Sequence, residues 1–322
     1  MGWSRESAGK PAARHLPVNG HGRFSGRAEP RLQPRPWVAG VVILLSAGPP
    51  VRLTAQSQGT VLIDLPGSTR AAGLRGAGAA LVGDAGAVFS NPAGIATIRR
   101  LSIEGAYQRS AGGTTVGSGA LALRAGRLSW GFGVAALDTS GVLPRATNVL
   151  GLSSLVVRTS FMALGTSVKY VRETLAGTTA DAWAGDVGVA IAVFDLMAFG
   201  ASVQNIGGDL GGGARLPRST RAGFTMNYVD PQGSYRLLTT LEGQWPSPGS
   251  ALLIVGVEGG VVAHGVGLVG RLGCGGRSPS TAASPCSYGA GLELGRLHLD
   301  YAYRMFDAPA RGTHRLGLRW TP

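Results

Sequence analysis

The 322-residue sequence predicts an all-β fold: a transmembrane antiparallel β-barrel of about 14 strands with a short N-terminal plug segment. From Leu101 onward, bulky apolar residues alternate with small or polar ones, as in strands whose one face meets an apolar environment. Charged residues make up only 15% and 53 residues are glycine, whereas soluble domains carry about 25% charged residues and roughly 7% glycine. No apolar run long enough for a spanning helix follows the first 60 residues.

Residues 1–55 are the predicted N-terminal extension and signal peptide. Arg31 and Arg35 precede the apolar run WVAGVVILLSA, and a small-residue exit ends at Ala55, where we expect cleavage. A single membrane anchor is the alternative, although this run of 11 residues is too short to span a bilayer. Because residues 1–36 are polar and long for the front of a signal peptide, we expect translation to start downstream. Export and a barrel fold together predict the cell outer membrane as the location.

Residues 56–100 are the predicted plug segment. The stretch from Arg70 to Ile98 contains six glycines and ends in Asn91-Pro92-Ala93-Gly94 and four further residues. A dinucleotide-binding loop is not expected, because Leu81 stands where GxGxxG needs its third glycine and no strand precedes. Glycine and alanine allow backbones to pack closely in a confined space, so we expect this segment to fold inside the barrel.

Residues 101–322 are the predicted barrel. Long connections follow the odd-numbered strands and short ones follow the even-numbered strands, which is the asymmetry of bacterial outer-membrane barrels. The first loop is short and the fourth strand is weakly patterned, so 12 strands is the alternative. The expected strands lie near 101–109, 114–124, 127–137, 149–158, 160–172, 181–194, 196–204, 219–229, 234–245, 250–261, 264–273, 287–294, 296–305 and 314–321. The long connections are 138–148, 173–180, 205–219, 274–286 and 306–313.

The two faces of these strands differ in bulk. The bulky face carries Trp or Tyr at strand tips and is expected to meet lipid, while the small face lines the lumen. Isolated charges on the small face are expected to pair or be hydrated inside the lumen, or, as the alternative, to line a substrate path. They are Glu104, Lys169, Asp186, Arg236, Glu242, Glu258, Asp300, Arg304 and Arg319.

Cys274 and Cys286 bracket a turn-rich stretch and are the two cysteines of the chain. An exported protein meets an oxidising compartment, so a disulfide is expected, with two unpaired thiols as the alternative. No histidine or third cysteine lies near them, and no metal site is predicted.

The formal charge of +13 does not predict nucleic-acid binding. The basic residues are spread along the chain, and no basic run with interleaved aromatic residues occurs. The five histidines form no motif, and neither HExxH nor GxSxG is present. The chain is therefore predicted to be no enzyme and to need no cofactor.

The stretch ending in the NPAG box resembles the N-terminal motif of FadL-like outer-membrane barrels. A closer resemblance is to the PorV/PorQ family, which shares SVQNIGG at 202–208, LDYAYR at 299–304 and THRLGLRW at 313–320. The order and spacing of these pieces carry the resemblance from Arg70 to Trp320. It implies a 14-stranded barrel whose N-terminal segment, with Asn91, Pro92 and Gly94, reaches the lumen.

These resemblances imply two functions. PorV and PorQ relatives imply an accessory to type IX-like protein secretion that binds the secretion channel or exported proteins. FadL-like relatives imply the alternative, a channel for the uptake of small hydrophobic compounds, and a barrel that only presents loops is a third option. Predicted outer loops such as GGDLGGGARLPRS are not apolar, which favours the protein partner over the solute. Outer-membrane lipid is the expected surrounding in each case.

Overall fold

The structure is a computed structural model that describes residues 62, 66–110, 113–139, 145–193, 196–211, 214–229, 233–276, 283–306 and 312–322. All of them fall within one unit of the chain, Leu53–Pro322. The signal peptide and its cleavage after Ala55 lie outside the described residues and stay predictions.

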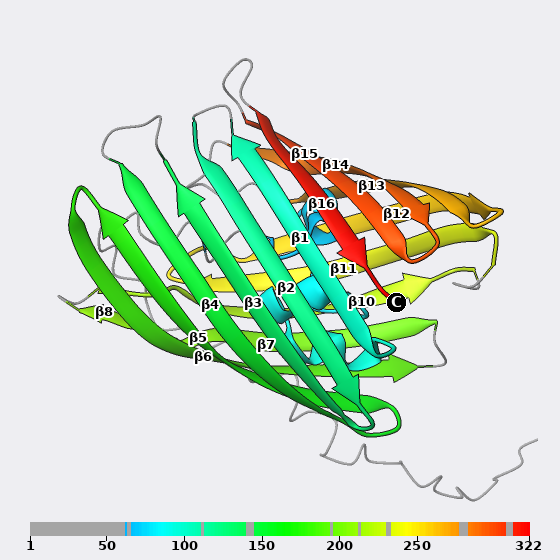
Figure 1. Cartoon of the computed structure of the whole chain (residues 1–322), viewed down its shortest axis with the longest axis horizontal. Coiled ribbons are helices and arrows are strands. Elements are labelled where there is room, and N and C mark those ends of the chain that lie inside the picture. Colours follow the sequence, from blue (N-terminus) through cyan, green and yellow to red (C-terminus); the bar gives the residue numbers. More distant parts are fainter. Residues whose placement is uncertain are drawn as a thin grey trace, which may run out of the picture. The chain divides into compact units, whose positions relative to one another are not determined.

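Fourteen antiparallel strands close into a barrel (Figure 1), so the predicted fold class is confirmed and the 12-strand alternative is wrong. β1 pairs with β16 to close the barrel, with Ile103 opposite Trp320. The strands are β1 (Leu101–Ser110), β2 (Thr115–Ala125), β3 (Leu128–Asp138), β4 (Ala146–Arg158), β5 (Met162–Leu175), β6 (Thr178–Val193), β7 (Met197–Gly207), β10 (Arg218–Asn227), β11 (Tyr235–Ser247), β12 (Leu252–Ala263), β13 (Val266–Gly275), β14 (Ala283–Leu294), β15 (Leu297–Phe306) and β16 (Gly312–Trp320).

Two predicted connections are organised differently from the expectation. The predicted loop 173–180 is a two-residue turn, because Ala176 and Gly177 have φ of 51° and 85°, the left-handed pair that a tight hairpin requires. β-Branched Thr174 and Thr178 extend the strands on both sides, so β5 and β6 reach 14 and 16 residues. The predicted loop 205–219 holds a small separate sheet of β8 (Asp209–Gly211) and β9 (Ala214–Arg215).

The two faces of the strands lie in different environments. On β6, Trp183 points outward with 67% of its surface exposed, whereas Asp186 points into the lumen with 0% exposed. The outward face is apolar and would be costly to expose to water over so large an area. The inward face combines Gly, Ala and Ser with scattered charges and with larger apolar residues such as Leu152 and Val171, and its small residues leave space inside the barrel.

Three short helices precede β1 in the chain. They lie inside the barrel, against its wall (Figure 1). They are α1 (Thr69–Gly73) and the 3-10 helices η3 (Ala85–Phe89) and η4 (Pro92–Thr97). None of the described helices is long and apolar enough to cross a membrane. We call residues 66–100, which contain these helices, the plug.

Candidate functional site

The plug folds through local capping. Ser68 begins α1, and its hydroxyl accepts a hydrogen bond of 3.0 Å from the Ala71 nitrogen. Asn91 begins η4 in the same way, with Oδ1 accepting from the Ala93 nitrogen at 3.0 Å. Pro92 stands at the first helical position, where no N–H is needed. The NPAG motif is therefore the start of a helix.

Glycines of the barrel wall lie directly against the plug. A Cβ on Gly200 would overlap the carbonyl oxygen of Ala79, and one on Gly165 would lie 2.7 Å from the Ala93 nitrogen. We call these positions the glycine wall, because any side chain there would collide with the plug or crowd it. Its members are Gly131, Gly133, Gly165, Gly188, Gly200, Gly256, Gly273, Gly289 and Gly317.

Asn91 joins the plug to itself and to the wall. Its Nδ2 donates to the carbonyl oxygens of Ala79 at 2.6 Å and Val189 at 3.0 Å. The side chain is completely buried. Gly94 packs against Ala87 of η3, where a Cβ would come within 2.8 Å. The motif residues thus fix how η3, η4 and β6 meet.

Two buried wall carboxylates accept hydrogen bonds from the plug backbone. Glu242 on β11 accepts from the nitrogens of Gly78 at 2.6 Å and Ala79 at 2.7 Å. Glu104 on β1 accepts from Gly86 at 3.0 Å and Thr69 at 3.3 Å. Hydrogen bonds to ionised acceptors are about twice as strong as neutral ones. These contacts hold backbone groups of the plug that its short helices leave unpaired.

An ion-pair network joins α1 to the opposite strands. Arg70 donates to both oxygens of Glu258, at 2.8 Å each, and Arg271 donates to Glu258 at 2.6 Å. Arg271 also donates to Asp300 at 2.6 Å. Arg70 reaches Asp84 at 3.1 Å within the plug. Glu258 has both of its guanidinium partners only when the plug is docked. Because removing one partner of a buried ion pair is costly, the network favours the docked position.

Of the remaining predicted lumen charges, Arg319 contacts the network through Asp84, and the others make separate contacts. Lys169 pairs with Asp186 at 2.9 Å beside a bulge between β6 and β7, and Arg319 pairs with Asp84 of the plug. Arg236 lies 3.8 Å from Glu293. Arg304 donates to the Ser284 carbonyl at 3.3 Å near the other end of the barrel.

Among the charged residues absent from the predicted set are Arg70 and Asp84 in the plug and the pair Arg271 and Arg315 in the wall. The wall pair could have been found by the period of two, since Arg315 precedes Leu316, which is 61% exposed to the outside. The wall partners of Arg70 and Asp84, which are Glu258 and Arg319, lie on distant strands, and no local pattern indicates them.

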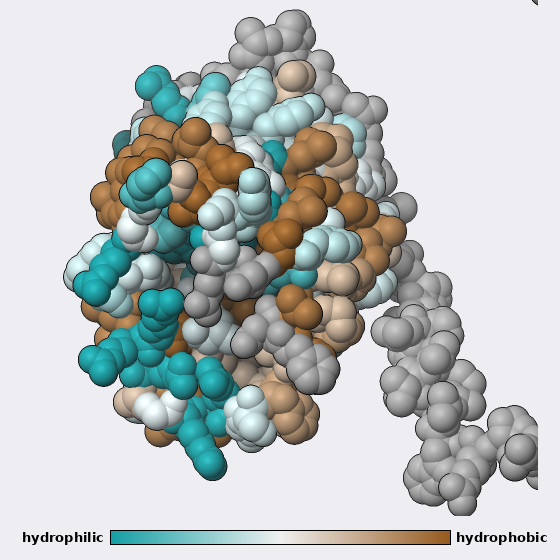
Figure 2. Space-filling view, turned by 90° about the vertical axis from the view of Figure 1, so that its right-hand side faces the viewer, coloured by the Kyte–Doolittle hydropathy of each residue, from teal (hydrophilic) through white to brown (hydrophobic). Residues whose placement is uncertain are grey.

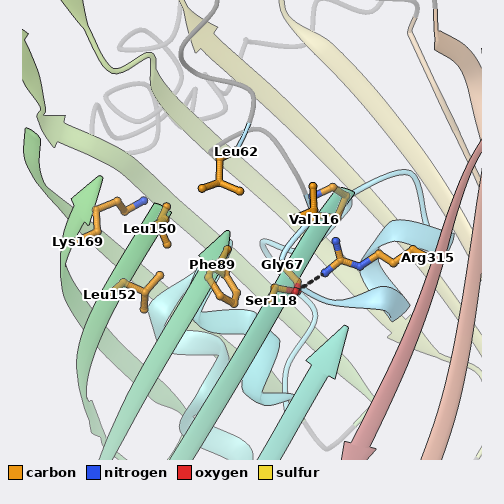
Figure 3. Close-up of a pocket in the computed structure, with 11 residues that line it drawn as sticks. Leu62, Gly67, Phe89, Val116, Ser118, Leu150, Leu152, Lys169 and Arg315 are labelled. Atoms are coloured by element: carbon orange, nitrogen blue, oxygen red, sulfur yellow. Dashed lines mark hydrogen bonds between the residues drawn. The ribbon is translucent and has the colours of Figure 1, made fainter. Parts of the chain in front are cut away.

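A narrow cavity with a largely apolar lining, to which Lys169 also contributes, lies between the plug and strands β2–β5 (Figure 3). Phe89 of η3 faces Leu150 and Leu152 of β4, and Leu62 reaches the same space. Arg315 lies at its edge and donates to Ser118 at 3.0 Å and to the Gly67 carbonyl at 2.9 Å. The cavity volume is about 20 Å³, which holds little more than one water. On the other side of the plug, a cavity of about 390 Å³ is lined by Arg70, Arg236 and His298 among others.

The structure joins Cys274 and Cys286 in a disulfide between paired positions of β13 and β14. Within the described part of the chain, no group of three or more His, Cys, Asp or Glu side chains could hold a metal ion.

Replacing Asn91 with alanine is expected to loosen the plug while leaving the barrel folded. The change removes three hydrogen bonds and leaves buried carbonyl groups of Ala79 and Val189 without this donor, at a cost of about 2–3 kcal/mol. Hydrogen exchange on the refolded protein should show faster exchange of plug amides, with barrel amides unchanged. Asn227→Ala on β10 is the control. Plug exchange equal to that of the unmodified protein would contradict the role of Asn91.

No protein-family model matches this chain, and no curated protein matches it significantly. Solved structures share the fold. The Ralstonia pickettii toluene transporter TbuX has a TM-score of 0.58 at 14% identity, over 81% of this chain and 100% of that one. The Pseudomonas putida toluene transporter TodX gives 0.54 at 11% identity, over 80% and 97%.

A Pseudomonas aeruginosa FadL homologue gives a TM-score of 0.53 at 12% identity, over 79% of this chain and 98% of that one. At these identities the likeness concerns the fold alone. The chain therefore shares the fold of these three barrels, whereas membership of the PorV/PorQ family is not shown.

Proposed function

We propose that this chain is an outer-membrane channel for the uptake of small hydrophobic compounds, held closed by its plug. The proposal rests on one observation, the docking of residues 66–100 against the glycine wall of a closed 14-strand barrel. Close docking without side chains at the contact suits a segment that must seal a lumen. The fold shared with toluene transporters supports the same function.

The apolar part of the cavity lining supports an apolar solute. The narrow cavity beside the plug is lined by Leu62, Phe89, Val116, Leu150 and Leu152, with Ser118, Lys169 and Arg315 as polar members. A mostly apolar lining with a few polar groups is typical of small-molecule sites. The cavity is too small for such a molecule while the plug is docked. Passage therefore requires the plug to move. The polar connection at 207–219 favours the secretion role, and we give the fold shared with the toluene transporters more weight.

A disulfide lock between plug and wall tests the proposal. Val88 of η3 and Gly131 of β3 touch, with an added Cβ on Gly131 lying 2.5 Å from Val88 Cγ1, so Val88→Cys with Gly131→Cys should bridge after a small shift. Uptake of labelled toluene into cells that express the protein should fall to the empty-vector level when the pair is oxidised and return on reduction. The natural protein, with its Cys274–Cys286 disulfide, is the control for both treatments.

Two results would refute the proposal. One is a natural protein that gives no uptake above the empty vector for toluene and a set of other apolar probes. The other is uptake that proceeds unchanged with the lock fully oxidised, because a static plug would then have no part in passage. Recovery of the protein outside the outer-membrane fraction would remove its basis altogether.

A further inference from the structure

Arginines gather at one end of four neighbouring strands, β1 to β4. This end carries the short turns, such as Gly126–Arg127 between β2 and β3. The backbone nitrogen of Arg124 donates to the Arg100 carbonyl at 2.8 Å, and that of Arg158 donates to the Arg127 carbonyl at 2.8 Å. These residues therefore stand on adjacent strand ends, about 5 Å from one strand to the next. We call Arg99, Arg100, Arg124, Arg127 and Arg158 the arginine row.

The arginine row has no counter-charge in the described part of the chain. None of the five forms an ion pair there, and residues 97–102, 122–130 and 155–163, which make up these strand ends, contain no Asp or Glu. At the opposite end of the barrel, Arg145 pairs with Asp138 and Arg172 with Asp181. Five like charges side by side repel one another, so an external anion would stabilise them.

Two members of the row are held in place and three can reach outward. Arg124 donates to the Ile98 carbonyl at 3.1 Å and Arg158 to the Ala96 carbonyl at 3.3 Å, both at the end of the plug. Arg99, Arg100 and Arg127 are exposed. Guanidinium groups bind phosphate through two parallel hydrogen bonds, and partly fixed groups lose less entropy when they do so.

Lipid-facing apolar side chains begin one residue away from the row. Leu123, Leu128 and Val157 are the direct sequence neighbours of Arg124, Arg127 and Arg158, and each is more than a third exposed on the outer face. Figure 2 shows hydrophilic side chains gathered at the lower left of this end, with apolar side chains beside them. Arginines therefore border lipid-facing apolar side chains on this surface. A partner that carries a phosphate group next to an apolar chain matches both parts of it.

We propose that the arginine row binds the phosphate groups of anionic phospholipids in the adjoining leaflet. Short turns mark the periplasmic end of outer-membrane barrels, so that leaflet is the inner one. The apolar neighbours favour a lipid over an acidic protein, because a protein would gain nothing from side chains immersed in the bilayer. The proposal rests on the membrane placement of the barrel and is independent of any transported solute.

Native mass spectrometry of the barrel released from vesicles of equal phosphatidylglycerol and phosphatidylethanolamine tests this proposal. The natural protein should retain phosphatidylglycerol preferentially. The triple variant Arg99→Gln/Arg100→Gln/Arg127→Gln keeps Arg124 and Arg158, which donate to plug carbonyls, and should lose that preference roughly tenfold or more. The charge-matched control is Arg109→Gln/Arg215→Gln/Arg218→Gln, which removes three exposed arginines at the opposite end.

Equal phosphatidylglycerol retention by the natural protein and the triple variant would overturn the proposal. So would an equal loss in the control triple, which would show a general charge effect. If the triple variant fails to fold, the single change Arg127→Gln gives the same comparison, with an expected loss of a few fold. Retention of inorganic phosphate without lipid selectivity would also count against a lipid site.

Discussion

Replacing Gly200 with leucine is expected to drive the plug from the wall and turn the closed barrel into an ion-conducting pore. A Cβ at this position already overlaps the Ala79 carbonyl, and the next plug residue, Ala80, lies 2.9 Å away. Both contacts involve backbone or Cα atoms, which cannot rotate aside. Overpacking on this scale costs about 3 kcal/mol, which raises the ratio of displaced to docked plug on the order of 100-fold. Planar bilayer recordings measure the result directly.

Gly117→Leu is the matched control for this experiment. Gly117 lies on β2 and faces outward, with no atom within 4 Å of an added Cβ. The same change of residue there should leave the protein silent in the bilayer, although it alters the lipid-facing surface by the same amount. Conductance that rises equally in both variants would indicate general damage to the barrel. A silent Gly200→Leu that folds normally would show that the plug is held by contacts other than the glycine wall.

The period of two accounts for how much of the barrel can be predicted from sequence. Alternation assigns each residue of a strand to lipid or lumen, and the membrane makes that assignment strict, because a shift of one residue would place Asp186 or Glu242 in lipid. The ends of strands follow from weaker signals. At Ala176–Gly177 the tight turn depends on two left-handed residues, whereas the polar composition of 173–180 is that of a loop.

The candidate site is harder to predict, because its contacts join residues far apart in sequence. The glycine wall and the inward charges follow from the strand pattern alone. The plug has no period of two, so nothing local states which of its residues meets which strand. Arg70 and Glu258 are 188 residues apart, and their pairing exists only once the barrel has closed around α1. Composition therefore indicates that a segment of the chain occupies the lumen, while the structure is needed to show which contacts hold that segment.

Glu258→Gln is expected to destabilise the docked plug by about 3 kcal/mol or more. Glu258 accepts three hydrogen bonds from two guanidinium groups, Arg70 and Arg271. The glutamine keeps the size of the side chain and removes its charge, so two arginines are left with less counter-charge in a confined space. Removing one partner of a buried pair typically costs about 3–5 kcal/mol. The midpoint of chemical unfolding in lipid or detergent and the susceptibility of residues 66–100 to protease should both change.

A control variant and a double-mutant cycle separate this ion pair from a general effect of removing lumen charge. The control is Glu173→Gln, which removes a buried carboxylate that forms no ion pair with a described residue, so its unfolding midpoint should move less. Arg70→Met alone should be costly, but combined with Glu258→Gln it should add only the loss of the Arg70–Asp84 contact, because Glu258 is already neutral. Additive losses in the double variant would mean that Arg70 and Glu258 act independently. Coupling between them would show that the Arg70–Glu258 ion pair supplies a main part of the free energy that docks the plug. This ion pair joins the plug to the strands opposite the NPAG motif.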